Sequence, residues 1–290
     1  MSASDVQASE VKSRAVPEVL GGRYCIERLL GAGGMGTVYR ARDLLQEQFG
    51  DPQPYVALKV LSEAYEHSPD ASALLFNEYA LLRHLHHPNV LRPYSFNVDT
   101  THQRVFVVME LLRGPTLDRL LCERPLGVGW PVLRDIALPL LDAVAHAHAR
   151  GVLHGDIKPS NVLLSEDGVR VFDFGLGQAE AGTLEGLAHV SRHRVNAWTP
   201  GYAAPEILDG APLTRGADVF ALGCLLYELA SGKHPFKRQP ATKTRLKRPK
   251  NLPRHAWRAV RQALTVDPAK RHISAAQLHE ALMAKPGFWG

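Results

Sequence analysis

Residues 154–175 decide the fold, and they read HGDIKPSNVLLSEDGVRVFDFG. Two short apolar runs flank a Ser-Glu-Asp-Gly loop, a pattern that predicts a β-hairpin. Asp156, Lys158 and Asn161 precede this hairpin, and Asp173 follows it. Because a hairpin returns its two ends to the same place, we expect these four side chains to converge. Carboxylate and amide oxygens are ligands that Mg²⁺ prefers, and an ammonium group suits a phosphate.

The composition is that of a soluble globular protein. The chain has 290 residues, of which 45% are hydrophobic and 22% charged, enough for one large domain or two lobes. Its longest apolar run, Val219–Ala230, is too short to cross a bilayer, and Met1–Pro17 has no signal-peptide core. Three widely separated cysteines argue against a disulfide framework or a zinc site. We therefore expect a cytoplasmic protein that does not insert into membranes.

The positive charge of the chain is modest and partly local. The formal net charge is +5, and seven lysines and arginines lie between Lys237 and Lys250. A basic run of this kind either meets an acidic partner or nucleic acid, or is a solvated loop, which is the commoner case. We therefore expect no nucleic-acid partner.

The N-terminal third contains a glycine-rich turn between two predicted strands. Residues 1–20 are expected to be a disordered leader, and order should begin near Tyr24–Ile26. Glycine at positions 31, 33, 34 and 36 lets the backbone approach a ligand closely. The chain then continues as a strand through Thr37–Tyr39, whereas a dinucleotide-binding turn opens a helix. The pattern therefore favours a strand–turn–strand cover over phosphate groups.

A lysine and a glutamate follow in elements that can bring them together. Lys59 lies in the predicted strand Val56–Leu61, and a buried lysine needs an anionic partner. The apolar spacing predicts a helix over about 71–84, and this helix offers Glu78, unless Glu78 is an ordinary solvated carboxylate. A fully apolar strand over 105–109 is then broken by the sequence Glu-Leu-Leu-Arg-Gly.

The C-terminal half is predicted to be mainly helical. A helix spans about 132–149, where Pro139 should introduce a kink, and we interpret His146 and His148 as surface or packing residues. Residues 176–206 are loop-like. A helix that is apolar all round begins at Asp218, so we expect it to be buried and to end at Gly232.

These motifs occur in the order found in eukaryotic-type protein kinases, and the chain resembles their bacterial serine/threonine branch. The match runs from Gly31 to Arg271, with Ala-Pro-Glu at 204–206 and a terminal motif at 266–271. The resemblance implies an α+β bilobal fold. Its smaller lobe, residues 21–112, would hold a five-stranded antiparallel sheet and one helix. The larger lobe, residues 113–285, would be mainly helical, followed by a tail over 286–290, with ATP bound between the lobes.

The resemblance also implies a mechanism. Asp156 would accept the proton of the substrate hydroxyl, and Lys158 would meet the γ-phosphate. The catalytic set that it implies is Asp156, Lys158, Lys59, Glu78 and Thr199. The nucleotide-binding set is Leu30, Gly31, Ala32, Gly33, Gly34, Met35, Gly36, Val38, Ala57, Lys59, Met109, Glu110 and Leu112. Asn161 and Asp173 would bind Mg²⁺, with Mn²⁺ as an alternative.

Further residues are assigned by the same resemblance. Asp218 would hold the backbone of the catalytic loop, and Arg271 would pair with Glu206. The partners implied are protein substrates with serine or threonine acceptors, the kinase itself in autophosphorylation, and a cognate phosphatase. Three alternatives stay open: a pseudokinase scaffold, a small-molecule phosphotransferase of the aminoglycoside type, and a nucleic-acid-binding module built on the basic run.

One position departs from the family pattern. Gly155 stands where most family members have an arginine that pairs with a phosphorylated residue of the activation loop. We therefore expect loop phosphorylation not to be the main activating step, unless Arg192 or Arg194 replaces that arginine. Autophosphorylation at Thr183 or Ser191 remains compatible with this expectation.

Overall fold

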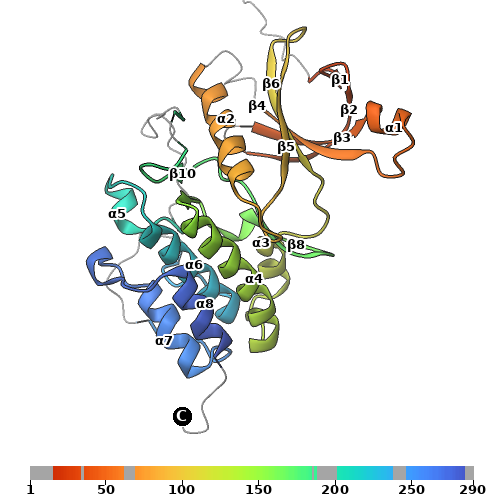
Figure 1. The fold of residues 1–290 in the computed structure, drawn as a ribbon. Coiled ribbons are helices and arrows are strands. Elements are labelled where there is room, and N and C mark those ends of the chain that lie inside the picture. The colour runs from red at the N-terminus through yellow and green to blue at the C-terminus, as the bar shows by residue number, and fades with distance from the viewer. Residues whose placement is uncertain are drawn as a thin grey trace, which may run out of the picture.

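The computed structural model describes residues 16–33, 36–61, 69–184, 186–187, 201–237 and 246–284. Figure 1 shows a twisted antiparallel sheet with α2 beside it, above a group of packed helices. The predicted α+β fold with two lobes is confirmed. The sheet's last strand in sequence ends at Glu110, close to the predicted lobe boundary at 112.

Among the described residues, the sheet has six strands rather than the predicted five, in the order β1-β2-β3-β4-β6-β5. The strands are β1 (Val19–Leu20), β2 (Tyr24–Ala32), β3 (Gly36–Asp43), β4 (Tyr55–Leu61), β5 (Pro93–Asp99) and β6 (Arg104–Glu110). The additional strand β1 lies inside the predicted leader and pairs with β2. Gly21 and Gly22, with φ values of 58° and 63°, make the tight turn between them. Leu20 is fully buried, so the expectation of disorder is wrong for this part of the leader. Residues 1–15 lie outside the described ranges.

Two helices accompany the sheet in the described part, where one was predicted. The additional helix is α1 (Leu44–Gln48), and the side chain of Asp43 caps it by accepting from the N–H groups of Leu45 and Gln46. The predicted helix is α2 (Pro69–His84). One side of α2 places Leu75 and Leu81 in the core, and Glu78 on the same helix is also buried. That burial excludes the interpretation of Glu78 as a solvated carboxylate.

The larger lobe contains the helices and the predicted hairpin. Its elements are α3 (Leu117–Glu123), α4 (Trp130–Ala149), β7 (Val152–Leu153), the 3₁₀ helix η2 (Pro159–Asn161), β8 (Val162–Ser165), β9 (Gly168–Val171), β10 (Gln178–Ala179), α5 (Pro205–Leu208), α6 (Arg215–Ser231), α7 (Arg254–Ala263), η4 (Pro268–Lys270) and α8 (Ala275–Met283). Strands β8 and β9 pair antiparallel, which confirms the hairpin. Helix α6 is buried on every side between α4 and α7 and ends at Gly232 in a left-handed conformation, with φ 69°.

Helix α4 runs without interruption through Pro139, so a kink at that residue stays a prediction. In the part of the chain that the structure describes, every helix is too short or too polar to cross a lipid bilayer.

Asp99 links the first and last turns of the sheet. Its carboxylate accepts hydrogen bonds from the N–H groups of Gly21 at 2.8 Å, Thr101 at 2.9 Å and His102 at 2.9 Å. Burial alone would raise the pKa of Asp99, but these bonds and the His102 ring lower it to about 2. A carboxyl group whose pKa is lowered by folding stabilises the folded state at pH values above its pKa in the unfolded chain, about 3.9. This contribution is lost as the pH falls towards 2.

Asp99→Asn should therefore lower the free energy of unfolding by about 1.5–3 kcal/mol at pH 7, the range for hydrogen bonds to a charged group. Urea unfolding at pH 7 and at stepwise lower pH measures this, and the difference from the unmodified protein should shrink towards pH 2. Asp135→Asn, on the exposed side of α4, is the control. A difference that does not change with pH would contradict the assignment.

Candidate active site

Lys59, Glu78 and Asp173 meet between the two lobes. Lys59 Nζ lies 2.7 Å from both carboxylate oxygens of Glu78 and 2.8 Å from Oδ1 of Asp173. The lysine comes from β4, the glutamate from α2 and the aspartate from the end of the predicted hairpin. The pair of Lys59 with Glu78 that the sequence predicts is therefore present in the structure, with an additional contact to Asp173.

The pKa values of this cluster reflect burial and charge. Burial alone would lower the pKa of Lys59, but the carboxylates of Asp173 and Glu78 raise it, so the ammonium group stays charged. The Lys59 charge holds the pKa of Asp173 below its usual value. Burial raises the pKa of Glu78 more than Lys59 lowers it. Perturbed values of this kind concentrate at functional sites, although structural ion pairs also produce them.

Asp156, Lys158 and Asn161 contact one another in the loop that precedes the hairpin. Lys158 Nζ lies 2.6 Å from Oδ2 of Asp156. The side-chain amide of Asn161 donates to the carbonyl oxygen of Asp156 at 2.8 Å and to its Oδ2 at 3.2 Å. Burial raises the pKa of Asp156, against the opposing effect of Lys158. The N–H of Phe172 donates to the carbonyl of Asn161 at 3.1 Å, so the two ends of the hairpin are tied next to Asp173.

Asp218, in the first turn of α6, holds the backbone of the loop that contains Asp156. Its carboxylate accepts from the N–H of His154 and from the N–H of Gly155, both at 2.8 Å. The ring of His148, predicted only as a surface or packing residue, is buried and lies 3.0 Å from the same carboxylate. Burial alone would raise the pKa of Asp218, but the His148 ring and the backbone donors lower it. Asp218 thus fixes the backbone immediately before Asp156.

Backbone conformation around the two aspartates is unusual in two places. Asp173 has a φ of 65°, in the left-handed region that non-glycine residues seldom adopt. Phe174 next to it is buried against the ring of His154, with the ring centroids 4.3 Å apart. Gly155 has a φ of 79°, and a Cβ atom there would lie 2.5 Å from the carbonyl oxygen of Leu176. Any side chain at position 155 would therefore displace the chain that follows Asp173.

The predicted nucleotide-binding residues line up on adjacent strands. In the sheet register Val38 is opposite Lys59, and Ala57 is opposite Met109. Leu30, Gly31 and Ala32 end β2, and Gly36 begins β3, where a Cβ atom would lie only 2.8 Å from the carbonyl oxygen of Val60. Gly33 closes the turn by donating to the carbonyl of Gly36 at 2.9 Å. Gly34 and Met35 lie outside the described residues.

The segment after Met109 offers backbone groups to the site. The N–H of Glu110 donates to the carbonyl of Arg92 at 3.1 Å, and its side chain accepts from the N–H of Arg92 at 2.7 Å. The N–H and the side chain of Glu110 are therefore both directed to Arg92. Leu112 is half-buried and follows where the strand ends.

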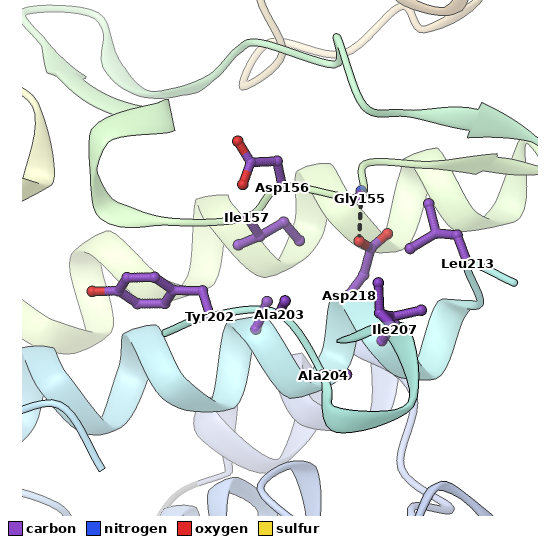
Figure 2. Close-up of a pocket in the computed structure, with 11 residues that line it drawn as sticks. Gly155, Asp156, Ile157, Tyr202, Ala203, Ala204, Ile207, Leu213 and Asp218 are labelled. Atoms are coloured by element: carbon purple, nitrogen blue, oxygen red, sulfur yellow. Dashed lines mark hydrogen bonds between the residues drawn. The ribbon is translucent and has the colours of Figure 1, made fainter. Parts of the chain in front are cut away.

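A small pocket separates the catalytic loop from the chain over 202–207. In Figure 2, Gly155 and Asp156 lie on one side of it, Tyr202 and Ala204 lie on the other, and Asp218 rises from α6 to Gly155. Neither Lys59 nor the strands of the smaller lobe line this pocket. Thr199, which the resemblance places near Asp156, lies outside the described residues.

A buried ion pair joins the 202–207 segment to the helical lobe. Arg271 Nη1 lies 2.6 Å from Oε1 of Glu206, and the same guanidinium donates to the carbonyls of Gly216 and Thr265. This is the pair that the sequence predicts. With its hydrogen bonds satisfied on both elements, Arg271 holds the 202–207 segment onto the helical lobe.

Known proteins resemble this chain over most of its length. The family model described as protein kinase domain matches residues 24–283. The chain is 34% identical over 269 residues to serine/threonine-protein kinase PkaA of Streptomyces coelicolor, covering 87% of this chain and 48% of that protein. It is 31% identical over 281 residues to serine/threonine-protein kinase pkn3 of Myxococcus xanthus, covering 90% of this chain and 50% of that protein.

The fold also matches a solved structure. The kinase domain of PknI from Mycobacterium tuberculosis superimposes with a TM-score of 0.68 at 25% identity, covering 91% of this chain and 96% of that chain. The chain spans about half the length of the two curated relatives named above.

Proposed function

Because the chain belongs to the protein kinase family, we propose that it transfers the γ-phosphoryl group of ATP to serine and threonine hydroxyls of proteins. The observation that carries this proposal is the contact of Lys59 with both Glu78 and Asp173, next to the loop that holds Asp156. Phosphoryl transfer depends mainly on positioning and on neutralising phosphate charge, and this cluster supplies both.

The described residues have distinct roles in the transfer. Lys59, fixed by Glu78, orients the α and β phosphates, and Lys158 meets the γ-phosphate. The substrate oxygen bonds to the γ-phosphorus while the bond from that phosphorus to the ADP oxygen breaks. The hydroxyl proton passes to the carboxylate of Asp156, whose raised pKa suits a group that must accept a proton. The carbonyl of Glu110 and a backbone group of Leu112 read the adenine.

The residues present also fit a divalent cation, for which we propose Mg²⁺, with Mn²⁺ as an alternative. The carboxylate of Asp173 contacts Lys59 through its Oδ1. The amide nitrogen of Asn161 donates to Asp156, so the side-chain oxygen of Asn161 is the atom that would bind a cation. Within the described ranges, no group of three or more His, Cys, Asp and Glu side chains has metal-binding geometry. Mg²⁺ is often held by one or two carboxylates together with substrate phosphates. Two such cations, held by Asp173 and Asn161, would neutralise phosphate charge when bound.

The remaining parts of the proposal concern partners and location. We propose protein substrates, a cognate phosphatase that reverses the reaction, and a cytoplasmic location without a nucleic-acid partner. Thr199 would contact the Asp156 loop and favour serine and threonine acceptors. A basic surface is present at Lys247 and Lys250, but the stretch 238–245 lies outside the described residues.

An assay with labelled ATP tests the proposal against the alternatives. Purified protein is incubated with a generic protein acceptor and, separately, with an aminoglycoside. The proposal predicts label on the protein acceptor and none on the small molecule. Nucleotide binding without transfer to either acceptor would indicate a pseudokinase, and label on the aminoglycoside would indicate a small-molecule phosphotransferase.

Gly155 leads to a prediction about activation. Because position 155 has no side chain to pair with a phosphorylated loop residue, the dephosphorylated protein should already be active. The protein is treated with a phosphatase, the phosphatase is removed, and the initial rate on a peptide acceptor is measured. The rate should change less than about twofold, within the range of ordinary surface electrostatics.

A protein whose activity depends on loop phosphorylation would give a different and specific pattern of rates. A large fall in rate that preincubation with ATP restores, and that Thr183→Ala or Ser191→Ala makes permanent, would contradict the prediction. It would mean that another cation has replaced the missing arginine. Thr183 is half-buried and packs against Gly151, whereas Ser191, Arg192 and Arg194 lie outside the described residues.

A further inference from the structure

Glu180 and Arg215 form an ion pair that the catalytic assignments do not use. Glu180 follows β10, seven residues after Asp173, and Arg215 is the first residue of α6. Arg215 Nε donates to Oε1 of Glu180 at 2.9 Å, and its terminal nitrogen donates to Oε2, so the contact is bidentate. Bidentate pairs of arginine and carboxylate fix geometry as well as contributing energy.

The backbone at Glu180 is held at the same time. Its N–H donates to the carbonyl of Gly151 at 2.7 Å, and its carbonyl accepts from the N–H of Thr183 at 3.0 Å. Immediately before it, β10 pairs with β7, with Gln178 opposite Leu153 and Ala179 opposite Val152. The side chain of Glu180 therefore extends from a turn whose backbone is held by hydrogen bonds. Its contact with Arg215 fixes the position of that turn relative to α6.

Helix α6 thereby contacts both functional loops through its first turn. Asp218, three residues after Arg215, holds the N–H groups of His154 and Gly155 just before Asp156. Arg215 holds the segment that follows Asp173. The same helical turn thus contacts both the loop that would activate the substrate hydroxyl and the segment that follows Asp173.

Gly155 cannot supply this connection. Glycine has no cationic side chain. The Cβ atom of any larger residue at that position would lie 2.5 Å from the carbonyl oxygen of Leu176. Arg215, on a different element, is a cation that does contact this segment, through Glu180.

We propose that Glu180 and Arg215 are positioning residues for phosphoryl transfer to protein acceptors, which hold the segment after Asp173 in its working position without a phosphate group. This inference rests on the proposed kinase function. Because both side chains are partly exposed, the pair contributes little to global stability. Its effect should appear in the use of the protein acceptor, and neither in ATP binding nor in thermal unfolding.

The test compares variants of the phosphatase-treated full chain. Glu180→Gln and Arg215→Gln should each lower kcat/KM for a peptide acceptor by about fivefold, the upper range for an exposed ion pair. KM for ATP and the Tm should stay unchanged. The exchanged double variant, Glu180→Arg with Arg215→Glu, should recover most of the loss, because the two charges can pair again in reverse order.

A matched control comes from α3, where Arg119 and Glu123 form another exposed ion pair, 3.3 Å apart. Arg119→Gln should leave kcat/KM for the peptide unchanged. Glu180→Gln and Arg215→Gln proteins as active as the unmodified chain would overturn the inference, and so would an exchanged variant with no recovery. An unmodified chain that labels no protein acceptor would instead contradict the proposed function itself.

Discussion

Lys59→Met should lower the turnover number for peptide phosphorylation by about a hundredfold or more, the effect of removing a preorganised charge from a transition state. In the structure, Lys59 contacts both Glu78 and Asp173. Without the Lys59 ammonium group, Glu78 and Asp173 lose a charged partner. The phosphates of ATP also lose a cation that would contact them. Steady-state kinetics with saturating ATP and peptide measure the effect.

The fold should survive this change with reduced stability. Removing one partner of a buried ion pair typically costs about 3–5 kcal/mol. Part of this cost is relieved because Glu78, whose pKa is already raised by burial, can take up a proton. Circular dichroism and thermal unfolding check the fold, and Lys233→Met, at an exposed lysine, is the control. Turnover retained in a folded Lys59→Met protein would show that the lysine has no part in catalysis.

Asp173→Asn should abolish measurable phosphoryl transfer at every Mg²⁺ concentration. The substitution removes the negative charge that binds the cation, and it also removes the charged partner of Lys59. Asn161→Ala should lower activity by a smaller factor, and added Mg²⁺ should partly restore it, because only one of two cation sites is weakened.

Titration of activity with MgCl₂ from micromolar to tens of millimolar separates the two variants. The Asn161→Ala curve should shift to higher Mg²⁺, while the Asp173→Asn protein stays inactive throughout. Activity of the unmodified chain that survives complete chelation of divalent cations would contradict the assignment of both residues.

The convergence of Asp156, Asn161 and Asp173 can be predicted from the sequence because these residues lie in short motifs with fixed local geometry. Asp156, Asn161 and Asp173 are brought together by one hairpin, whose strands and turn are visible in the amino-acid pattern. The pair of Lys59 with Glu78 is predicted because a buried lysine requires an anion and the next helix offers one. The position of Thr199 stays a prediction.

Two elements of the smaller lobe were missed although the sequence contains their signals. Val19–Leu20 followed by Gly21 and Gly22 is a hairpin pattern, but a strand of two residues gives little periodicity to detect. Helix α1 has five residues, and its main signal is Asp43 at the N-cap position. Short elements depend on tertiary contacts for their stability, so local patterns predict them poorly.

The ion pair of Glu180 with Arg215 could not be predicted from sequence for a different reason. The two residues are 35 positions apart and neither lies in a recognisable motif. Their contact depends on how β10 and α6 are placed by the packing of the whole lobe. The contact between His148 and Asp218 is similar, because only the fold brings the end of α4 to the start of α6.

We propose that transfer of the γ-phosphoryl group to protein hydroxyls depends on Asp156, and labelling with [γ-³²P]ATP followed by phosphoamino-acid analysis tests this proposal most directly. The unmodified chain and Asp156→Asn are compared at equal concentration with one protein acceptor and Mg²⁺. We expect phosphoserine and phosphothreonine with the unmodified chain, and at least about a hundredfold less label with Asp156→Asn, since general-base catalysis contributes about 10²–10⁴-fold. Equal labelling by the two proteins would contradict this role of Asp156.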